Sequence, residues 1–102
     1  MKKIINKKMY NTETAEEIKS ISYGRNRFDY SYYEEGLYQK KTGEFFLYGF
    51  GGPASKYRKE VAPHSWENGE NIIPLTLDEA KDWCAMYISP DRYEEIFGPV
   101  EE

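Results

Sequence analysis

The sequence has little of the two side chains that most often build metal and redox sites. It contains one cysteine, Cys84, and one histidine, His64, among its 102 residues. A single cysteine cannot form an internal disulfide, and no spacing of Cys and His resembles a zinc site. The sequence therefore predicts a protein with no metal site and no disulfide, and it favours a reducing compartment.

Long apolar runs are also missing. No segment approaches the roughly 20 apolar residues that a helix needs to cross a bilayer. The first residues, Met1-Lys2-Lys3, lead into a short strand-like segment instead of the apolar stretch of a signal sequence. We therefore expect a soluble, cytoplasmic protein with no membrane partner.

Aliphatic side chains are few, whereas aromatic ones are many. The chain has 10 Tyr, 5 Phe and 2 Trp, so aromatic residues make up 17 % of it. A Tyr ring can be buried while its hydroxyl stays hydrated or finds a partner, which suits a thin sheet with half-exposed faces or a binding surface. A chain of 102 residues supports one modest core, so we expect a single domain over residues 1–102.

Charge of each sign is concentrated in one half of the chain. Residues 1–59 hold 12 Lys and Arg against 7 Asp and Glu, whereas residues 60–102 hold 2 against 11. The net charge of -4 therefore conceals a basic half and an acidic half. Because a segregated field steers a protein toward charged macromolecules, this layout favours a binding function.

The first part of the chain predicts a hairpin, a short helix and a loop. Residues 3–10 have the pattern of two short strands around a turn. Either Thr12 or Thr14 is a suitable cap for a short helix through residues 15–18, because the acidic residues of its first turn favour the helix dipole. Residues 22–26 lack periodicity and predict a loop.

The strongest strand signal lies in the middle of the chain. Two aromatic-rich runs flank a turn at residues 41–43, which predicts a central β-hairpin over residues 28–48. Residues 56–69 are polar and contain a proline, so they predict a surface loop. Residues 72–75 predict an edge strand, where Pro74 is tolerated if its missing N–H faces away from the ladder.

The chain ends in two predicted helices. Thr76 and Glu79 form a capping box for a helix over residues 77–87, whose apolar side chains recur every three or four residues. A second helix is predicted to start with Pro90 at its first position and to end at Gly98.

Together these elements predict an α+β fold. We expect a small antiparallel sheet of about four or five short strands, with one short N-terminal helix and two C-terminal helices. Trp83 of the first C-terminal helix should pack against the central hairpin, and Cys84 on the same helix face should be buried.

No set of residues specifies a reaction. His64 has acidic neighbours in the sequence but no evident catalytic partner, and Cys84 lies on an apolar helix face that raises a thiol pKa. The glycine-rich residues 49–53 lack the Lys and Ser/Thr of a phosphate loop, so they predict a sharp reversal or a close backbone approach. The glutamate pairs that we expect on element surfaces are residues 16/17, 34/35, 94/95 and 101/102. We therefore predict no catalytic, cofactor-binding or metal-binding residue, and a protein that is not an enzyme.

The basic half of the chain suggests one binding hypothesis. Basic side chains interleaved with aromatics on a sheet hold single-stranded nucleic acid by phosphate contacts and base stacking. Lysines that protect a sheet edge produce the same pattern. The candidate nucleic-acid contacts are Lys2, Lys3, Lys7, Lys8, Arg25 and Arg27.

The acidic half suggests another binding hypothesis. Carboxylates on rigid helices can imitate phosphates toward the basic groove of a protein partner. A solvated acidic face is the alternative. The candidate partner-binding residues are Asp78, Asp82, Glu94 and Glu95.

Five segments share a pattern with known small proteins. They are residues 3–15 (KIINKKMYNTETA), 37–49 (LYQKKTGEFFLYG), 51–57 (GGPASKY), 72–75 (IIPL) and 94–98 (EEIFG). These segments, which are spread over most of the chain, resemble a family carried by phages and conjugative elements of Gram-positive bacteria. Some proteins that share this type of N-terminal module are anti-CRISPR inhibitors of type II Cas9. The NKK turn of this chain differs from the Asn-Gly-Lys turn of that family.

The resemblance implies a non-enzymatic inhibitor that binds Cas9, or its guide-RNA complex, or blocks the assembly of the two in a bacterial host cell. The guide-binding channel of Cas9 is strongly positive, which suits an acidic surface. The alternative is a small RNA- or DNA-binding accessory protein of a mobile element that uses the basic, Tyr-rich half.

Overall fold

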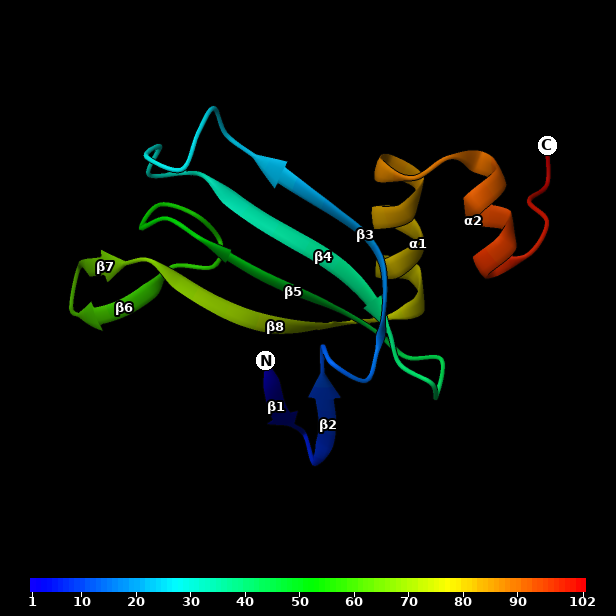
Figure 1. Cartoon of the computed structure of the whole chain (residues 1–102), viewed down its shortest axis with the longest axis horizontal. Coiled ribbons are helices and arrows are strands. Elements are labelled where there is room, and N and C mark those ends of the chain that lie inside the picture. Colours follow the sequence, from blue (N-terminus) through cyan, green and yellow to red (C-terminus); the bar gives the residue numbers. More distant parts are fainter.

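A four-stranded antiparallel sheet runs through the molecule and carries two small hairpins and two helices (Figure 1). The computed structural model describes all 102 residues. In chain order the elements are β1 (Lys2–Ile5), β2 (Lys8–Asn11), β3 (Glu16–Tyr23), β4 (Tyr33–Gln39), β5 (Phe45–Gly51), β6 (Lys59–Ala62), β7 (Ser65–Glu67), β8 (Gly69–Leu75), α1 (Leu77–Tyr87) and α2 (Pro90–Phe97). The large sheet has the strand order β3-β4-β5-β8. Neither helix is long and apolar enough to cross a membrane.

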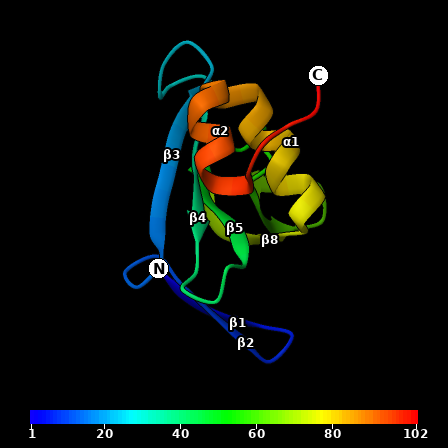
Figure 2. The same ribbon diagram turned by 90° about the vertical axis from the view of Figure 1, so that its right-hand side faces the viewer.

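One face of the large sheet packs against the two helices, which lie together on that side (Figure 2). Alternate residues of β4 and β5 point to this face and meet the apolar face of α1. The α2 helix joins them through Phe97, whose ring centroid lies 5.4 Å from that of Phe45. The buried residues of this helix-side cluster are Leu37, Phe45, Leu47, Ala80, Trp83 and Cys84.

Local signals place both helices as predicted. The Thr76 hydroxyl accepts a hydrogen bond from the Glu79 N–H at 3.2 Å, and the Glu79 carboxylate accepts one from the Thr76 N–H at 2.9 Å. Ser89 caps α2, Pro90 stands at its first position, and the helix ends at Gly98, which has a φ of 91°. The prediction of two C-terminal helices is therefore confirmed.

The β1-β2 hairpin covers one end of the opposite face of the large sheet. Tyr10 of this hairpin is buried against Phe46 and Ile72, and the rings of Tyr10 and Phe46 meet edge to face with centroids 5.5 Å apart. In its turn, Asn6 and Lys7 have φ values of 51° and 66°, as a two-residue hairpin loop of type I′ requires. The predicted first hairpin is confirmed.

The predicted N-terminal helix is wrong, because this part of the chain forms the edge strand β3. The register between β3 and β4 shifts between Glu17 and Lys19, so Ile18 is an extra residue at a bulge. The bulge lets Ile18 and Ile21 both pack against the helix-side cluster, although they are three residues apart. A helix of about four residues gains too few hydrogen bonds to offset its nucleation, whereas the strand pairs with β4 and half-buries both isoleucines.

Three other boundaries differ from the prediction. Residues 22–23 belong to β3 instead of a loop, the first strand of the central hairpin begins only at Tyr33, and residues 59–67 contain the β6-β7 hairpin. These differences arise from backbone pairing, which local composition does not encode. The edge strand over residues 72–75 is confirmed as part of β8, which pairs with β5.

Replacing Trp83 with alanine should destabilise the fold by roughly 3 to 5 kcal/mol, because Trp83 is buried in the helix-side cluster and its truncation leaves a cavity. Met86 lies on the same helix with 74 % of its surface exposed. The control Met86→Ala should therefore change the free energy of unfolding by less than about 0.5 kcal/mol. Urea unfolding followed by circular dichroism measures both, and equal effects of the two substitutions would refute the packing.

Candidate functional site

A buried carboxylate, that of Glu35 on β4, joins three parts of the fold. Its Oε1 accepts a hydrogen bond from the Tyr57 hydroxyl at 2.7 Å, and its Oε2 accepts one from Trp83 Nε1 at 2.8 Å. The half-exposed Lys56 pairs its ammonium with the same carboxylate. The prediction that Glu34 and Glu35 both lie on the surface is therefore wrong for Glu35, which is 3 % exposed.

The Glu35 site is closed and has a structural role. Every buried polar side-chain atom of the protein has a hydrogen-bond partner, so nothing in this site is left free for a ligand. Burial and the hydrogen bond to Glu35 raise the pKa of the Tyr57 hydroxyl, which keeps it a donor. A Cβ on Gly49 would collide with the Tyr57 ring. The glycine-rich run thus provides the close backbone approach that was predicted, and the group that approaches it is a side chain of the same protein.

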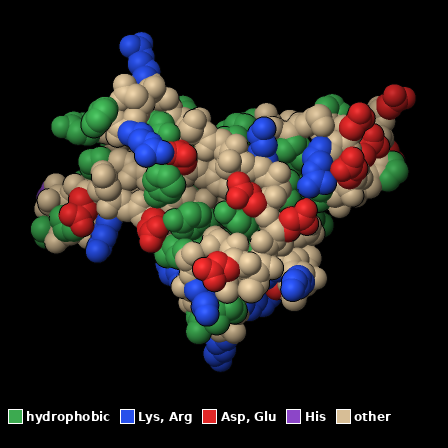
Figure 3. Space-filling model, viewed as in Figure 1, with side chains coloured by type: hydrophobic (Ala, Val, Ile, Leu, Met, Phe, Trp, Pro, Cys, Tyr) green, Lys and Arg blue, Asp and Glu red, His purple; other side chains and the backbone are tan.

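The opposite face of the large sheet has a section that no other element covers. Beside the end covered by the β1-β2 hairpin, a hollow of about 120 Å³ lies over Gly36. At Phe50 it adjoins a second hollow of about 380 Å³. Figure 3 shows this face, with apolar side chains across its middle and acidic side chains beside them. We call the two hollows the sheet groove, and its principal residues are Glu17, Glu34, Gly36, Tyr38, Tyr48, Phe50 and Glu70.

Three carboxylates of the sheet groove each accept a hydrogen bond from a tyrosine hydroxyl. The pairs and their O···O distances are Tyr38 to Glu17, 3.2 Å, Tyr48 to Glu70, 2.7 Å, and Tyr32 to Glu34, 2.9 Å. The bond to Glu70 raises the pKa of Tyr48 to about 12, so the hydroxyl stays a donor at neutral pH. The only ion pair within this set joins Arg27 Nη2 to Glu34 Oε2 at 3.5 Å. The groove therefore combines aromatic rings with carboxylates that are held in place and mostly lack a cation.

The sequence hypotheses missed the sheet groove because its carboxylates come from three different strands. A usable signal exists in the central hairpin, where alternate residues share a face. Register pairs Gly36 with Tyr48 and Glu34 with Phe50, so these four side-chain positions lie on one face. The positions of Glu17 and Glu70 depend on the β3 and β8 registers, which the sequence pattern did not define.

The predicted acidic residues all lie exposed on the two C-terminal helices. Asp78 and Asp82 occupy successive turns of α1, and Glu94 and Glu95 lie on α2. Of the four, only Glu95 forms an ion pair, with Arg92 at 3.0 Å. Acidic side chains gather at the end of the molecule that carries α2 and the C-terminus (Figures 1 and 3). We call the four predicted residues, two on α1 and two on α2, the acidic helix end.

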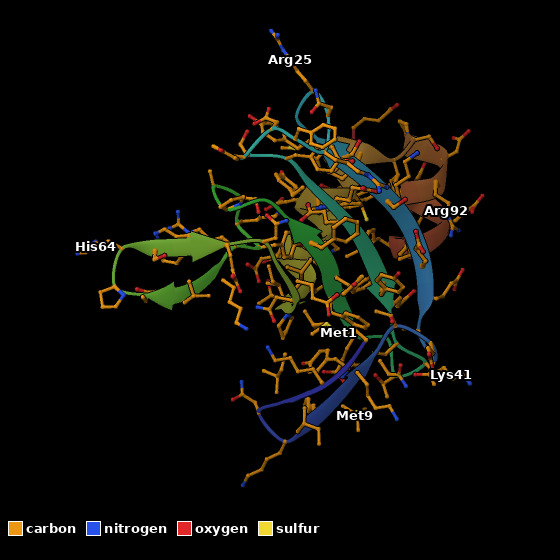
Figure 4. The ribbon with its side chains drawn as sticks, turned by 60° about the vertical axis from the view of Figure 1, so that its left-hand side comes forward. Met1, Met9, Arg25, Lys41, His64 and Arg92 are labelled. Atoms are coloured by element: carbon orange, nitrogen blue, oxygen red, sulfur yellow. The ribbon has the colours of Figure 1, made fainter.

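The predicted basic residues separate into two groups that the structure does not bring together. Lys2, Lys3, Lys7 and Lys8 lie on the β1-β2 hairpin, close to where β3 begins, whereas Arg25 and Arg27 follow the other end of β3. Two of the hairpin lysines contact residues outside the hairpin: Lys8 pairs with Glu44 at 2.9 Å, and Lys3 Nζ donates to Asn71 Oδ1 at 2.6 Å. Arg25 points away from the molecule (Figure 4). A single continuous basic surface is therefore absent.

The single histidine and the single cysteine lie in different parts of the fold. His64 is at the exposed tip of the β6-β7 hairpin (Figure 4), and Cys84 is buried in the helix-side cluster, where burial raises the pKa of its thiol. No group of three or more His, Cys, Asp or Glu side chains is placed to hold a metal ion.

Comparisons of the chain with protein-family models, with curated proteins and with solved structures found no match. The charge and geometry of the surfaces described above are therefore what the structure contributes to a functional proposal.

Replacing Glu35 with alanine should lower the free energy of unfolding by about 3 kcal/mol, because it leaves the buried Tyr57 hydroxyl and Trp83 N–H without an acceptor. The neighbour Glu34 points to the groove side, so the matched Glu34→Ala should cost less than about 1 kcal/mol. Thermal and urea unfolding measure both variants. A Glu35 variant as stable as the Glu34 variant would show that the buried network is not required.

Replacing His64 with asparagine, or Cys84 with serine, should leave the binding activity of the folded protein unchanged. Asparagine suits position 64 because His64 has a φ of 61°, which asparagine tolerates. Serine at position 84 places a hydroxyl in an apolar cluster, so binding should be measured well below the melting temperature of each variant. A folded His64→Asn protein that no longer binds its partner would refute this prediction and place His64 in the binding surface.

Proposed function

We propose that this protein is a non-enzymatic inhibitor that binds Cas9, or blocks its assembly with guide RNA, through the acidic helix end. The resemblance of five segments to a family that includes Cas9 inhibitors supports the choice of partner. The observation that carries the choice of surface is that Asp78, Asp82 and Glu94 are exposed and have no ion pair within the chain. Such an inhibitor acts in the cytoplasm of a bacterial host and needs no cofactor.

The acidic helix end suits a strongly positive partner for two physical reasons. Its carboxylates project from helices that are held by capping and by the helix-side cluster, so little backbone freedom is lost when a partner binds. Exposed and unpaired carboxylates also speed association with a basic surface by long-range attraction. A channel built for guide RNA presents such a surface.

The alternative function is an RNA- or DNA-binding accessory protein, and one observation favours it. The loop between β3 and β4 carries Arg25 and Arg27 together with Phe28 and Tyr30, whose exposed fractions are 94 % and 74 %. Exposed rings beside arginines can stack on unpaired bases. This loop offers only two arginines, and the lysines of the first hairpin lie at the other end of β3.

Charge reversal separates the two functions. Changing Asp78, Asp82, Glu94 and Glu95 to Lys should abolish binding to purified Cas9, whereas changing Lys2, Lys3, Lys7 and Lys8 to Glu should alter it little. Biolayer interferometry with free and guide-loaded Cas9 measures both, and circular dichroism checks folding, because Asp78 lies in the first turn of α1.

A nucleic-acid binder shows the opposite pattern. It binds single-stranded RNA with an affinity that falls steeply with salt, and it loses that affinity in the lysine variant. Micromolar RNA binding by the wild-type protein that disappears in the lysine variant would overturn the proposed function.

A further inference from the structure

We propose that the sheet groove binds an arginine-bearing basic segment of a protein partner. This is a second contact surface, on the face of the large sheet opposite to the helices, and it is distinct from the acidic helix end. The inference deepens the proposed function by naming the chemistry of the partner, and it rests on that function only in taking the partner to be a basic protein.

The sheet groove is an uncovered part of an otherwise covered sheet. The helices bury one face, and the β1-β2 hairpin covers one end of the other through Tyr10. Between that end and the β3-β4 loop, Tyr48 stays partly exposed and Phe50 is 39 % exposed. Gly36 lies on the floor between them and Glu17, and a Cβ there would approach the Tyr38 ring to 3.2 Å. Because Gly36 has no side chain, nothing projects from this position into the sheet groove.

The chemistry of the groove selects the occupant by charge. Three carboxylates, those of Glu17, Glu34 and Glu70, border it on three strands, and the tyrosine hydroxyls that donate to them fix where their charge lies. Only Glu34 has a cation of the same chain beside it, and that contact is long at 3.5 Å and exposed. This negatively charged border repels phosphates. A cationic side chain can instead pair with Glu17 and Glu70, which form no ion pair within the chain.

The aromatic floor selects the kind of cation. A guanidinium group is planar, stacks on an aromatic ring and donates hydrogen bonds to a carboxylate from its edge at the same time. The face of Tyr48 or Phe50 provides the first contact, and Glu17 or Glu70 provides the second. A lysine ammonium can satisfy the carboxylate but stacks less well, so arginine should be preferred.

The two hollows also set the size of the occupant. They adjoin at Phe50, and the larger one is also lined by Tyr32, by Gly52 and by Asn68, which directly precedes β8. Together they are open to solvent and are lined by several strands, which suits an extended peptide segment better than a compact small molecule.

The test uses a labelled nine-residue peptide of alternating glycine and arginine, with both ends blocked, and measures its binding to the full chain by fluorescence anisotropy. The groove variant carries Glu17→Gln, Glu34→Gln and Glu70→Gln. The matched control carries Glu60→Gln, Glu101→Gln and Glu102→Gln, which lie outside both the sheet groove and the acidic helix end, so both variants lose three charges and differ only in where they lose them. Glutamine keeps an acceptor for each tyrosine hydroxyl, which preserves the fold.

The groove variant should bind the peptide at least about tenfold more weakly than the control variant, because it loses charge-assisted hydrogen bonds. Phe50→Ala, which changes no charge, should also weaken binding, and a lysine peptide should bind less tightly than the arginine peptide. Amide shifts of Glu34, Gly36 and Phe50 in NMR spectra should follow the titration.

Equal losses in the two triple variants would mean that the peptide senses only net charge, and they would overturn the inference. Tighter binding of a single-stranded uridine RNA than of the peptide, with shifts at the same groove amides, would overturn it as well. The proposed function is judged separately with Cas9: peptide binding in the groove without Cas9 binding would refute that function and leave this inference standing.

Discussion

The carboxylate of Glu35 is the group on which the arrangement of the other elements depends. A buried charge is tolerated only where donors surround it, and here the donors come from α1 and from the loop that precedes β6. Trp83 must therefore orient its indole N–H toward β4, which fixes the rotation of α1 on the sheet. Tyr57 must lie flat over β5, which explains why glycine occupies position 49. One hydrogen-bonded carboxylate thus sets both the helix layer and the loop layer on the same face.

With the helix side of the sheet fixed in this way, the opposite side is free to serve another purpose. Its rings are largely tyrosines, whose hydroxyls reach carboxylates at the surface while the ring bodies cover Phe46 and the strands beneath. This explains how a chain with few aliphatic residues builds a stable sheet with one buried face and one partly exposed face. The partly exposed face and the acidic helix end are both negatively charged, yet their side chains differ. The helix end offers charge alone, whereas the groove joins charge to stacking surfaces.

The parts of the fold that the sequence predicts well are those determined by neighbours along the chain. The capping box at Thr76, the Pro90 start of α2 and the turn of the first hairpin are local, and the structure has all three. The N-terminal helix was wrong because it was predicted from a threonine cap and acidic neighbours, which are local signals, whereas these residues pair with β4 across the sheet. The burial of Glu35 and the convergence of three glutamates in the groove depend on register between distant strands. Acidic residues on the helices were therefore foreseeable, whereas the groove was not.

The bulge in β3 has a consequence for the behaviour of many copies of this chain. The strand is eight residues long and lies at the edge of the sheet, which is the geometry that invites one sheet to add to another. Because the hydrogen-bond register of β3 shifts at Ile18, a regular strand from another copy cannot pair along the whole of β3. At the other edge, Pro74 in β8 has no N–H to offer. One border is bent and the other lacks a donor, so neither is a good template for extending the sheet into a filament.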